Sequence, residues 1–489
     1  MPYKDFYFGA FTPDLGGAPN PADPAYLVDC LNLRPTPAGY RGTRVFTDVA
    51  SAALLTGGAA SIVDIGTTYA AVRNDTTYLF VASENVLNQS NTHGTSWSNV
   101  DTITDENLDI AQFDDYVITC EYNVAPMYKD ITTSQATVFS TLPDSPPQGG
   151  TVARIRDHLV IGRTSSDQYS VQWSAIGDPT DWPTPLTAEA ASKESGSQTL
   201  PSELGIVTKV VGGEEFGLVF QEHGITRMTY VGGRVVYEFD TFERNVGKLA
   251  IQSPYPIPQI TKVNDLYYFG EPNIGFFVTD GYRVRKISDG SISESFYANT
   301  ISHPDAGAGG HPLSMCFDWA RQQLIWTNSA TFALGYNPAL NQFFSMDGTF
   351  GRLFPIPFVL ASGTAPVEVQ QISTTGYLQK LTAANAGIGL QTGFIEIEPG
   401  YYVQLHGAHL LGAGVPGSLT LAYKAADDYN SDISIVQTGF TSLTAPGRGI
   451  VSSGRANAPL FAFRVSGTGG ESQLIQGIRV YYERGERVQ

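Results

Sequence analysis

The sequence predicts an all-β protein built on a β-propeller of six or seven irregular blades, with an extended N-terminal arm and a C-terminal antiparallel β-sandwich. The main observation is a polar turn followed by a short apolar strand, which recurs at intervals of about 40 to 60 residues. That interval is the length of one four-stranded blade with its loops. Clear copies begin at Thr76, Asp115, Asp157, Asp265 and Gln322, and weaker ones at Glu215 and Gly376.

Composition favours short strands joined by tight turns. Of 489 residues, 51 are Gly and 29 are Pro, and only 16% are charged. The best short helical pattern covers Ala188 to Lys193. The three cysteines, Cys30, Cys120 and Cys316, are odd in number and far apart, so we expect free, packed thiols and neither a disulfide framework nor a zinc site.

Changes in residue composition and strand pattern along the chain predict three domains. Residues 1–55 are rich in Pro, Gly and aromatic side chains, which indicates an ordered, extended arm lying on another surface, because proline disfavours regular strand pairing. Residues 56–385 carry the blade-like units. Residues 386–489 show longer alternating strands, as expected of an antiparallel β-sandwich.

The formal net charge of −18 argues against a protein that grips nucleic acid, since such proteins present basic surface to phosphate. It is compatible with a conduit past which DNA slides without sticking. No apolar run approaches the ~20 residues that span a bilayer. The N-terminus lacks the pattern of a secretory signal, which predicts synthesis in the cytoplasm.

Several short motifs invite a chemical interpretation, and each is better explained by structure. Gly412 to Gly417 matches G-x-G-x-x-G, but a strand pattern follows it, so we expect a hairpin turn and no dinucleotide site. Ser90 to Trp97 resembles the Asp-box of sialidase-type propellers, with Thr92 in place of the defining Asp, and predicts a structural turn.

The groups of acidic residues and histidines do not predict a catalytic or metal site either. Glu214, Glu215 and Glu222 are expected on a rim or solvent face, not as the paired carboxylates of a glycosidase. Asp428 to Asp432 lacks the later ligands of a calcium loop, and His303, Asp305 and His311 lack tight metal-ligand spacing. The sequence therefore predicts a protein that is not an enzyme, with no catalytic residue, cofactor or metal.

Three segments, in order, carry a resemblance to a known family. The first is Phe11-Thr12-Pro13-Asp14 with Asn32 and Pro37 to Arg41; the second is Trp173 to Trp182; the third runs from Gly217 through Gly247 and Ser253 to Tyr282. They resemble the tail hub or nozzle proteins of short-tailed bacteriophages, including those called packaged-DNA stabilisation proteins. In the second segment we expect Asp178 to cap backbone amides in a tight turn and Trp182 to fold onto the blade.

The resemblance implies a structural protein of the virion tail, made in the host bacterial cytoplasm. It implies a hexameric ring below the portal and adaptor proteins, with possible contacts to tail fibre or needle proteins. Such a ring retains packaged DNA and conducts it during ejection without sequence-specific binding. The arm would be a strap onto a neighbour, with Phe11, Pro13, Asp14, Tyr40 and Arg41 as assembly contacts. The alternative is a glycan-binding or glycan-cleaving β-propeller, and a generic interaction platform remains a third possibility.

Overall fold

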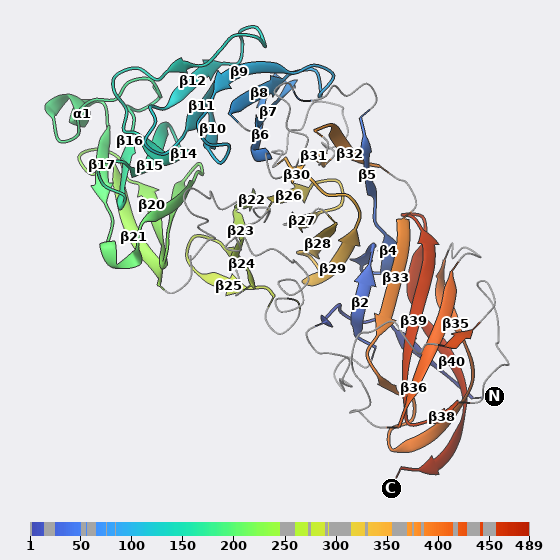
Figure 1. Ribbon diagram of the computed structural model, residues 1–489. Helices are drawn as coiled ribbons and strands as arrows, with labels where there is room; N and C mark the ends of the chain where they lie inside the picture. The colour runs from blue at the N-terminus through green and yellow to red at the C-terminus, as the bar shows by residue number, and fades with distance from the viewer. Residues whose placement is uncertain are drawn as a thin grey trace.

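The computed structural model contains a ring of four-stranded blades and a two-sheet domain beside it (Figure 1). It describes residues 2–13, 25–49, 55, 65–74, 76–83, 85–244, 260–271, 275–288, 292, 314–327, 331–354, 369–373, 376–382, 386–413, 419–427, 441–443 and 456–488.

The ring contains seven antiparallel units of four strands among the described residues. Blade one consists of β6 (Ile65–Arg73), β7 (Thr76–Ser83), β8 (Val86–Ser90) and β9 (Ser98–Thr102). Blade two consists of β10 (Asp109–Phe113), β11 (Tyr116–Cys120), β12 (Met127–Asp130) and β13 (Ser140–Thr141). Blade three consists of β14 (Gly149–Ile155), β15 (His158–Thr164), β16 (Ser170–Trp173) and β17 (Gly196–Thr199). Blades four and five are β18 (Val207–Val211), β19 (Phe216–Gln221), β20 (Gly224–Tyr230) and β21 (Tyr237–Arg244); β22 (Thr261–Val263), β23 (Leu266–Glu271), β24 (Gly275–Thr279) and β25 (Val284–Lys286). Blades six and seven are β26 (Ser314–Asp318), β27 (Gln323–Thr327), β28 (Phe332–Asn337) and β29 (Gln342–Asp347); β30 (Arg352–Leu353), β31 (Gln370–Ile372), β32 (Leu378–Thr382) and β5 (Val45–Asp48).

The ring closes between blades seven and one. The buried Arg352 of β30 donates from Nε to the carbonyl of Ile65 at 2.7 Å, and Thr68 Oγ1 donates to the carbonyl of Leu353 at 2.7 Å. The second strands are almost completely buried, as in β27, because both faces pack against neighbouring blades. This arrangement confirms the predicted fold class, and the number of blades is seven.

The weaker copies of the repeat have different positions within their blades. Phe216 begins β19, the second strand of blade four, and Tyr377 precedes β32, the third strand of blade seven. The predicted helix is present as α1 (Ala188–Ser192), where Thr187 Oγ1 accepts a hydrogen bond from the amide of Ala190. A 3₁₀ turn, η3 (Ser202–Leu204), follows in the same region. Within the described ranges, no helix has the length and apolar character needed to cross a membrane.

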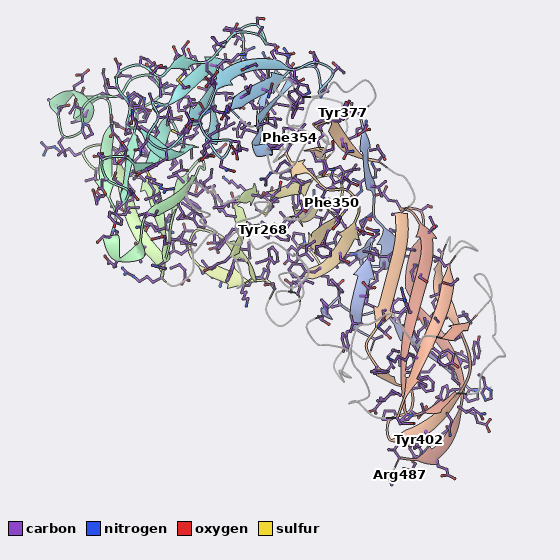
Figure 2. The ribbon with its side chains drawn as sticks, in the orientation of Figure 1. Tyr268, Phe350, Phe354, Tyr377, Tyr402 and Arg487 are labelled. Carbon is purple, nitrogen blue, oxygen red and sulfur yellow. The ribbon has the colours of Figure 1, made fainter. Side chains whose placement is uncertain are left out.

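The C-terminal strands form two packed sheets. The elements are β33 (Ala386–Thr392), β34 (Ile395–Glu396), β35 (Tyr401–Ala413), β36 (Thr420–Ala426), β37 (Thr441–Leu443), β38 (Ala456–Ala458), β39 (Leu460–Gly469) and β40 (Leu474–Arg487). Phe463 and Val465 of one sheet share an apolar core with Ile478 and Val480 of the other, as a sandwich requires. Figure 2 places Tyr402 and Arg487 at the end of this sandwich that lies away from the propeller.

The N-terminal segment belongs to both domains and is not a separate arm. Its first four strands are β1 (Tyr3–Tyr7), β2 (Leu27–Leu31), β3 (Leu33–Thr36) and β4 (Gly39–Gly42). β1 and β4 pair with β40, β2 pairs with β33, and β5 is the outermost strand of blade seven. The prediction that proline prevents pairing here is wrong, since Pro35 lies opposite Tyr40 in the β3–β4 hairpin. β3 is a sheet edge, where the amide hydrogen that proline lacks is not needed.

Asn32 joins the two domains. β2 pairs antiparallel with β33 of the sandwich and, through Leu31 and Ser345, parallel with β29 of blade six. The amide of Asn32 donates to the carbonyl of Ser345 at 2.8 Å, and its carbonyl accepts from Thr43 at 2.9 Å. Its side chain donates to the carbonyl of Gly387 at 2.7 Å and accepts from the amide of Asp347 at 2.8 Å. Asn32 is buried and has a φ of 54°, a conformation that asparagine tolerates better than most residues.

A charged cluster forms a second link at the same junction. Arg321, in the β26–β27 turn, donates to Asp318 at 3.0 Å and to Glu471 at 2.5 Å, and Arg44 donates to the other oxygen of Glu471 at 2.9 Å. Burial raises the pKa of Glu471, but the hydrogen bonds from Arg321 and Arg44 outweigh it and hold that pKa below its ordinary value. The cluster therefore joins blade six, the sandwich and the segment that leads to blade seven.

We predict that Asn32→Ala lowers the free energy of unfolding by about 3 kcal/mol, because it leaves the amide of Asp347 and the carbonyl of Gly387 unpaired and strains the positive φ. Asn32→Gly should lower the free energy of unfolding by about 1 kcal/mol less than Asn32→Ala does. Glycine adopts a positive φ without strain, but it makes none of the side-chain hydrogen bonds. Chemical denaturation measures both values. The control is Asn74→Ala, at an exposed residue with a φ of 45°, which should cost only about 1 kcal/mol. Equal losses at positions 32 and 74 would contradict the role of the side-chain hydrogen bonds.

Candidate functional site

The five residues expected as assembly contacts lie mostly inside this chain. Phe11, Pro13 and Tyr40 are buried, and the Tyr40 hydroxyl donates to the carbonyl of Gly9 at 2.5 Å. Arg41 is half-buried and donates to the carbonyl of Glu471 at 3.2 Å. Asp14 lies outside the described residues. Phe11, Pro13 and Tyr40 therefore pack within their own protein, and the role of these five residues as assembly contacts stays a prediction.

The turn that resembles an Asp-box joins the third and fourth strands of blade one. Ser90 Oγ accepts from the amide of Gly94 at 3.0 Å, and Thr92 Oγ1 accepts from the amide of Ser96 at 3.1 Å. Trp97 is buried against the core of the blade. The hydroxyls of Ser90 and Thr92 thus tie the turn, which confirms the structural interpretation.

The second family-like segment has the expected chemistry. Asp178 Oδ1 accepts from the amide of Thr180 at 2.9 Å, within a turn where Gly177 has a φ of 72°. Trp182 is buried between blades two and three, and its indole nitrogen donates to the carbonyl of Pro179 at 2.8 Å. The predicted capping and burial are both confirmed.

The acidic candidates that the structure describes are not brought together. Glu214 and Glu215 are exposed in the β18–β19 turn, whereas Glu222 lies in the β19–β20 turn at the opposite end of β19. The expected hairpin at the glycine motif is wrong, because the flanking strands β35 and β36 belong to different sheets. Gly414–Gly417, Asp428–Asp432 and the trio of His303, Asp305 and His311 lie outside the described residues.

All three cysteines are buried and unpaired, as expected, and burial raises the pKa of each thiol. Over the ranges that the structure describes, no group of three or more His, Cys, Asp or Glu residues is arranged to hold a metal ion.

A cavity among the described residues lies at one mouth of the propeller channel. It has a volume of about 680 Å³, and residues of the first strands of blades one to five line it. We define the channel mouth by its charged and glycine residues: Arg154, Arg156, Asp157, Lys209, Gly212, Gly213, Glu214 and Lys262. The strand repeat predicted mainly the second strands of the blades and not the first strands that line this site. The only signal in the sequence was the run Arg154 to Asp157 at a blade turn.

Ion pairs across blade boundaries fix part of the channel mouth. Lys209 of blade four donates to Asp109 Oδ1 of blade two at 2.5 Å, and the other oxygen of Asp109 accepts from Thr151 Oγ1 of blade three at 2.6 Å. Arg154 donates to Asp114 at 2.7 Å and lies over the ring of Phe113. The buried Lys209–Asp109–Thr151 contacts, together with the surface pair of Arg154 and Asp114, link blades two to four around the axis.

Two glycines at the channel mouth lie too close to neighbouring backbone to carry a side chain. A Cβ added to Gly212 would lie 1.8 Å from the carbonyl oxygen of Arg154, and one added to Gly213 would lie 2.4 Å from that of Phe216. Because both contacts are with backbone atoms, no side-chain rotation relieves them. The blade-four strand can approach its neighbours here only without side chains.

Comparisons with known proteins find likeness of fold alone. No family model matches the sequence, and no curated protein matches it. Similar solved structures include U3-55K (10% identity, TM-score 0.43, covering 70% of this chain and 99% of that one) and the WD40 repeats of RRP9 (9%, 0.41, 70% and 99%). YCF48 from Cyanidioschyzon merolae is 11% identical, with a TM-score of 0.40, covering 69% and 98%. The propeller assignment stands on strand pairing, and these likenesses do not bear on function.

We predict that Gly212→Ala lowers the free energy of unfolding by about 1 to 3 kcal/mol, because its Cβ would overlap the Arg154 carbonyl. Gly387→Ala is the matched control, since nothing lies within 4 Å of its Cβ and its effect should stay within about 0.5 kcal/mol. Thermal unfolding of the two variants provides the comparison. A neutral Gly212→Ala would show that the two strands can move apart freely.

Proposed function

We propose that this protein is a structural component of the tail of a short-tailed bacteriophage. It would form a hub or nozzle ring below the portal and adaptor, retain packaged DNA and conduct it during ejection. The observation that carries the proposal is that three family-like segments occur in order and form structural parts of the fold.

Each segment has a structural role in the fold, and only the first lies at the junction of the two domains. The first contributes Asn32 and the β3–β4 hairpin to the junction of propeller and sandwich. The second closes the turn of blade three with Trp182. The described portion of the third forms strands of blades four and five, from β19 to β24, whereas Gly247 and Ser253 lie outside the described residues. Structural roles of this kind suit a scaffold protein.

Under this proposal the DNA passage lies between subunits of the ring and not through the propeller. The cavity of about 680 Å³ at the channel mouth has the size of a small-ligand site. A cyclic ring requires head-to-tail interfaces, in which one surface of each subunit meets a different surface of the next. A net charge of −18 on every subunit would limit adhesion of the DNA backbone.

We expect negative-stain electron microscopy to show six-fold rings of the purified protein, either alone or when it is mixed with the portal–adaptor complex of its particle. An unrelated acidic propeller of similar mass serves as the control and should leave the complex unchanged. Monomers that fail to join the complex would contradict the proposal. A positive glycan screen of those monomers would instead favour the glycan-binding alternative.

A further inference from the structure

Two arginines at the junction of the propeller and the sandwich lie side by side on one face of a hairpin. Arg34 of β3 is directly opposite Arg41 of β4, so the two side chains leave the same face of the sheet with their Cβ atoms about 5 Å apart. Both side chains are half-buried. Like charges placed directly opposite each other destabilise a sheet, so this arrangement requires negative charge nearby.

The two carboxylates of this junction are already paired with other arginines. Arg321 Nη1 donates to Asp318 at 3.0 Å, and Arg321 Nε donates to Glu471 at 2.5 Å. The second oxygen of Glu471 accepts from Arg44 Nε at 2.9 Å. Each carboxylate therefore serves Arg321 or Arg44, and in the described part of the junction none is left to neutralise the β3–β4 pair.

The guanidinium groups of the β3–β4 pair keep unused donors. Arg41 Nη1 donates to the backbone carbonyl of Glu471 at 3.2 Å, which is a neutral acceptor. Arg34 Nε is buried and has no hydrogen-bond acceptor within the ranges that the structure describes. Burial lowers the pKa of Arg34, and the positive charges of Arg321 and Arg41 lower it further, while the nearby carboxylates offset this only in part. The charged Arg34 is therefore held in surroundings that are short of negative charge.

The chemistry of the pair selects a small, doubly charged oxyanion. Guanidinium groups present N–H donors in a planar fork that matches the oxygens of phosphate. A monoanion would neutralise only one of the two groups, whereas a phosphate dianion neutralises both. Only part of each side chain is open to solvent, and a chain with a net charge of −18 repels an extended polyanion.

We propose that Arg34 and Arg41 bind inorganic phosphate as its dianion, which neutralises both guanidinium groups and strengthens the contact of the β3–β4 hairpin with the β39–β40 turn and blade six. The site lies where the hairpin, Glu471 of the sandwich and Arg321 of blade six meet. The inference does not depend on the tail-hub proposal, because every residue of the site belongs to one chain.

The test uses the full-length protein in a chloride buffer at pH 8, where inorganic phosphate is mainly the dianion. Isothermal titration calorimetry should show saturable binding of phosphate, and dimethyl phosphate, which carries one charge, should bind at least about tenfold more weakly. Arg34→Gln and Arg41→Gln should each weaken phosphate binding about tenfold, the effect expected for loss of one charged hydrogen bond. The matched control Arg234→Gln removes the same charge from an exposed residue of the β20–β21 turn and should leave binding unchanged.

Thermal unfolding distinguishes phosphate binding from a purely structural role of the arginines. Without phosphate, Arg41→Gln should change the unfolding temperature little, because it also removes a like-charge contact. Phosphate should raise the unfolding temperature of the wild type at matched ionic strength, and should raise that of Arg41→Gln much less. If Arg41→Gln instead lowers the unfolding temperature equally in both buffers, the arginine has only a structural role and the inference is wrong.

Two other results would also overturn the inference. One is that phosphate does not bind the wild-type protein, or binds it equally well after both substitutions at Arg34 and Arg41. The other is that hexathymidylate binds more tightly than phosphate through the same two arginines, which would assign the site to a nucleic-acid backbone. Ring formation under the electron microscope is measured separately, so either proposal can fail alone.

Discussion

The organisation of the molecule depends on one crossing of the chain, at Asn32. There the N-terminal segment leaves the sandwich, contacts blade six and turns back, and the four hydrogen bonds of Asn32 join three separate parts of the sequence. Without this crossing, β2 could not pair with β29 and β33 together, and the ten-stranded sheet that unites the two domains would separate into a blade and a sandwich sheet. The positive φ at Asn32 provides the reversal in direction.

Closure of the propeller follows from the same crossing. β5 emerges from the junction and completes blade seven, whose other strands come from residues more than 300 positions later. β1 meanwhile pairs with β40, so both ends of the chain are tied into one sheet. Long-range pairing of this kind closes large loops and is slow to form, but it leaves few free strand edges. The arrangement suits a protein whose two domains must keep a fixed position and orientation relative to each other.

The strand repeat and the composition were sufficient to predict the propeller, the sandwich, the short helix and the buried cysteines. Local chemistry was also predictable, because the capping by Asp178 and the burial of Trp182 depend on neighbouring residues. The role of residues 1–55 was not predictable, because strands such as β1 and β5 pair with strands hundreds of residues away in the sequence. The channel mouth was missed for the same reason: Arg156, Gly213 and Lys262 meet only after three blades have closed.

The central claim is that the N-terminal segment is an integral part of both domains, and native-state hydrogen exchange tests it most directly. The account predicts that the amides of Asn32 and of Lys380 in β32, which pairs with β5, exchange with opening free energies close to those of β27 in the core of blade six. If the amides of residues 27–48 instead exchange at several kcal/mol lower free energy while β27 and β39 stay protected, the segment is a detachable strap and the account is wrong.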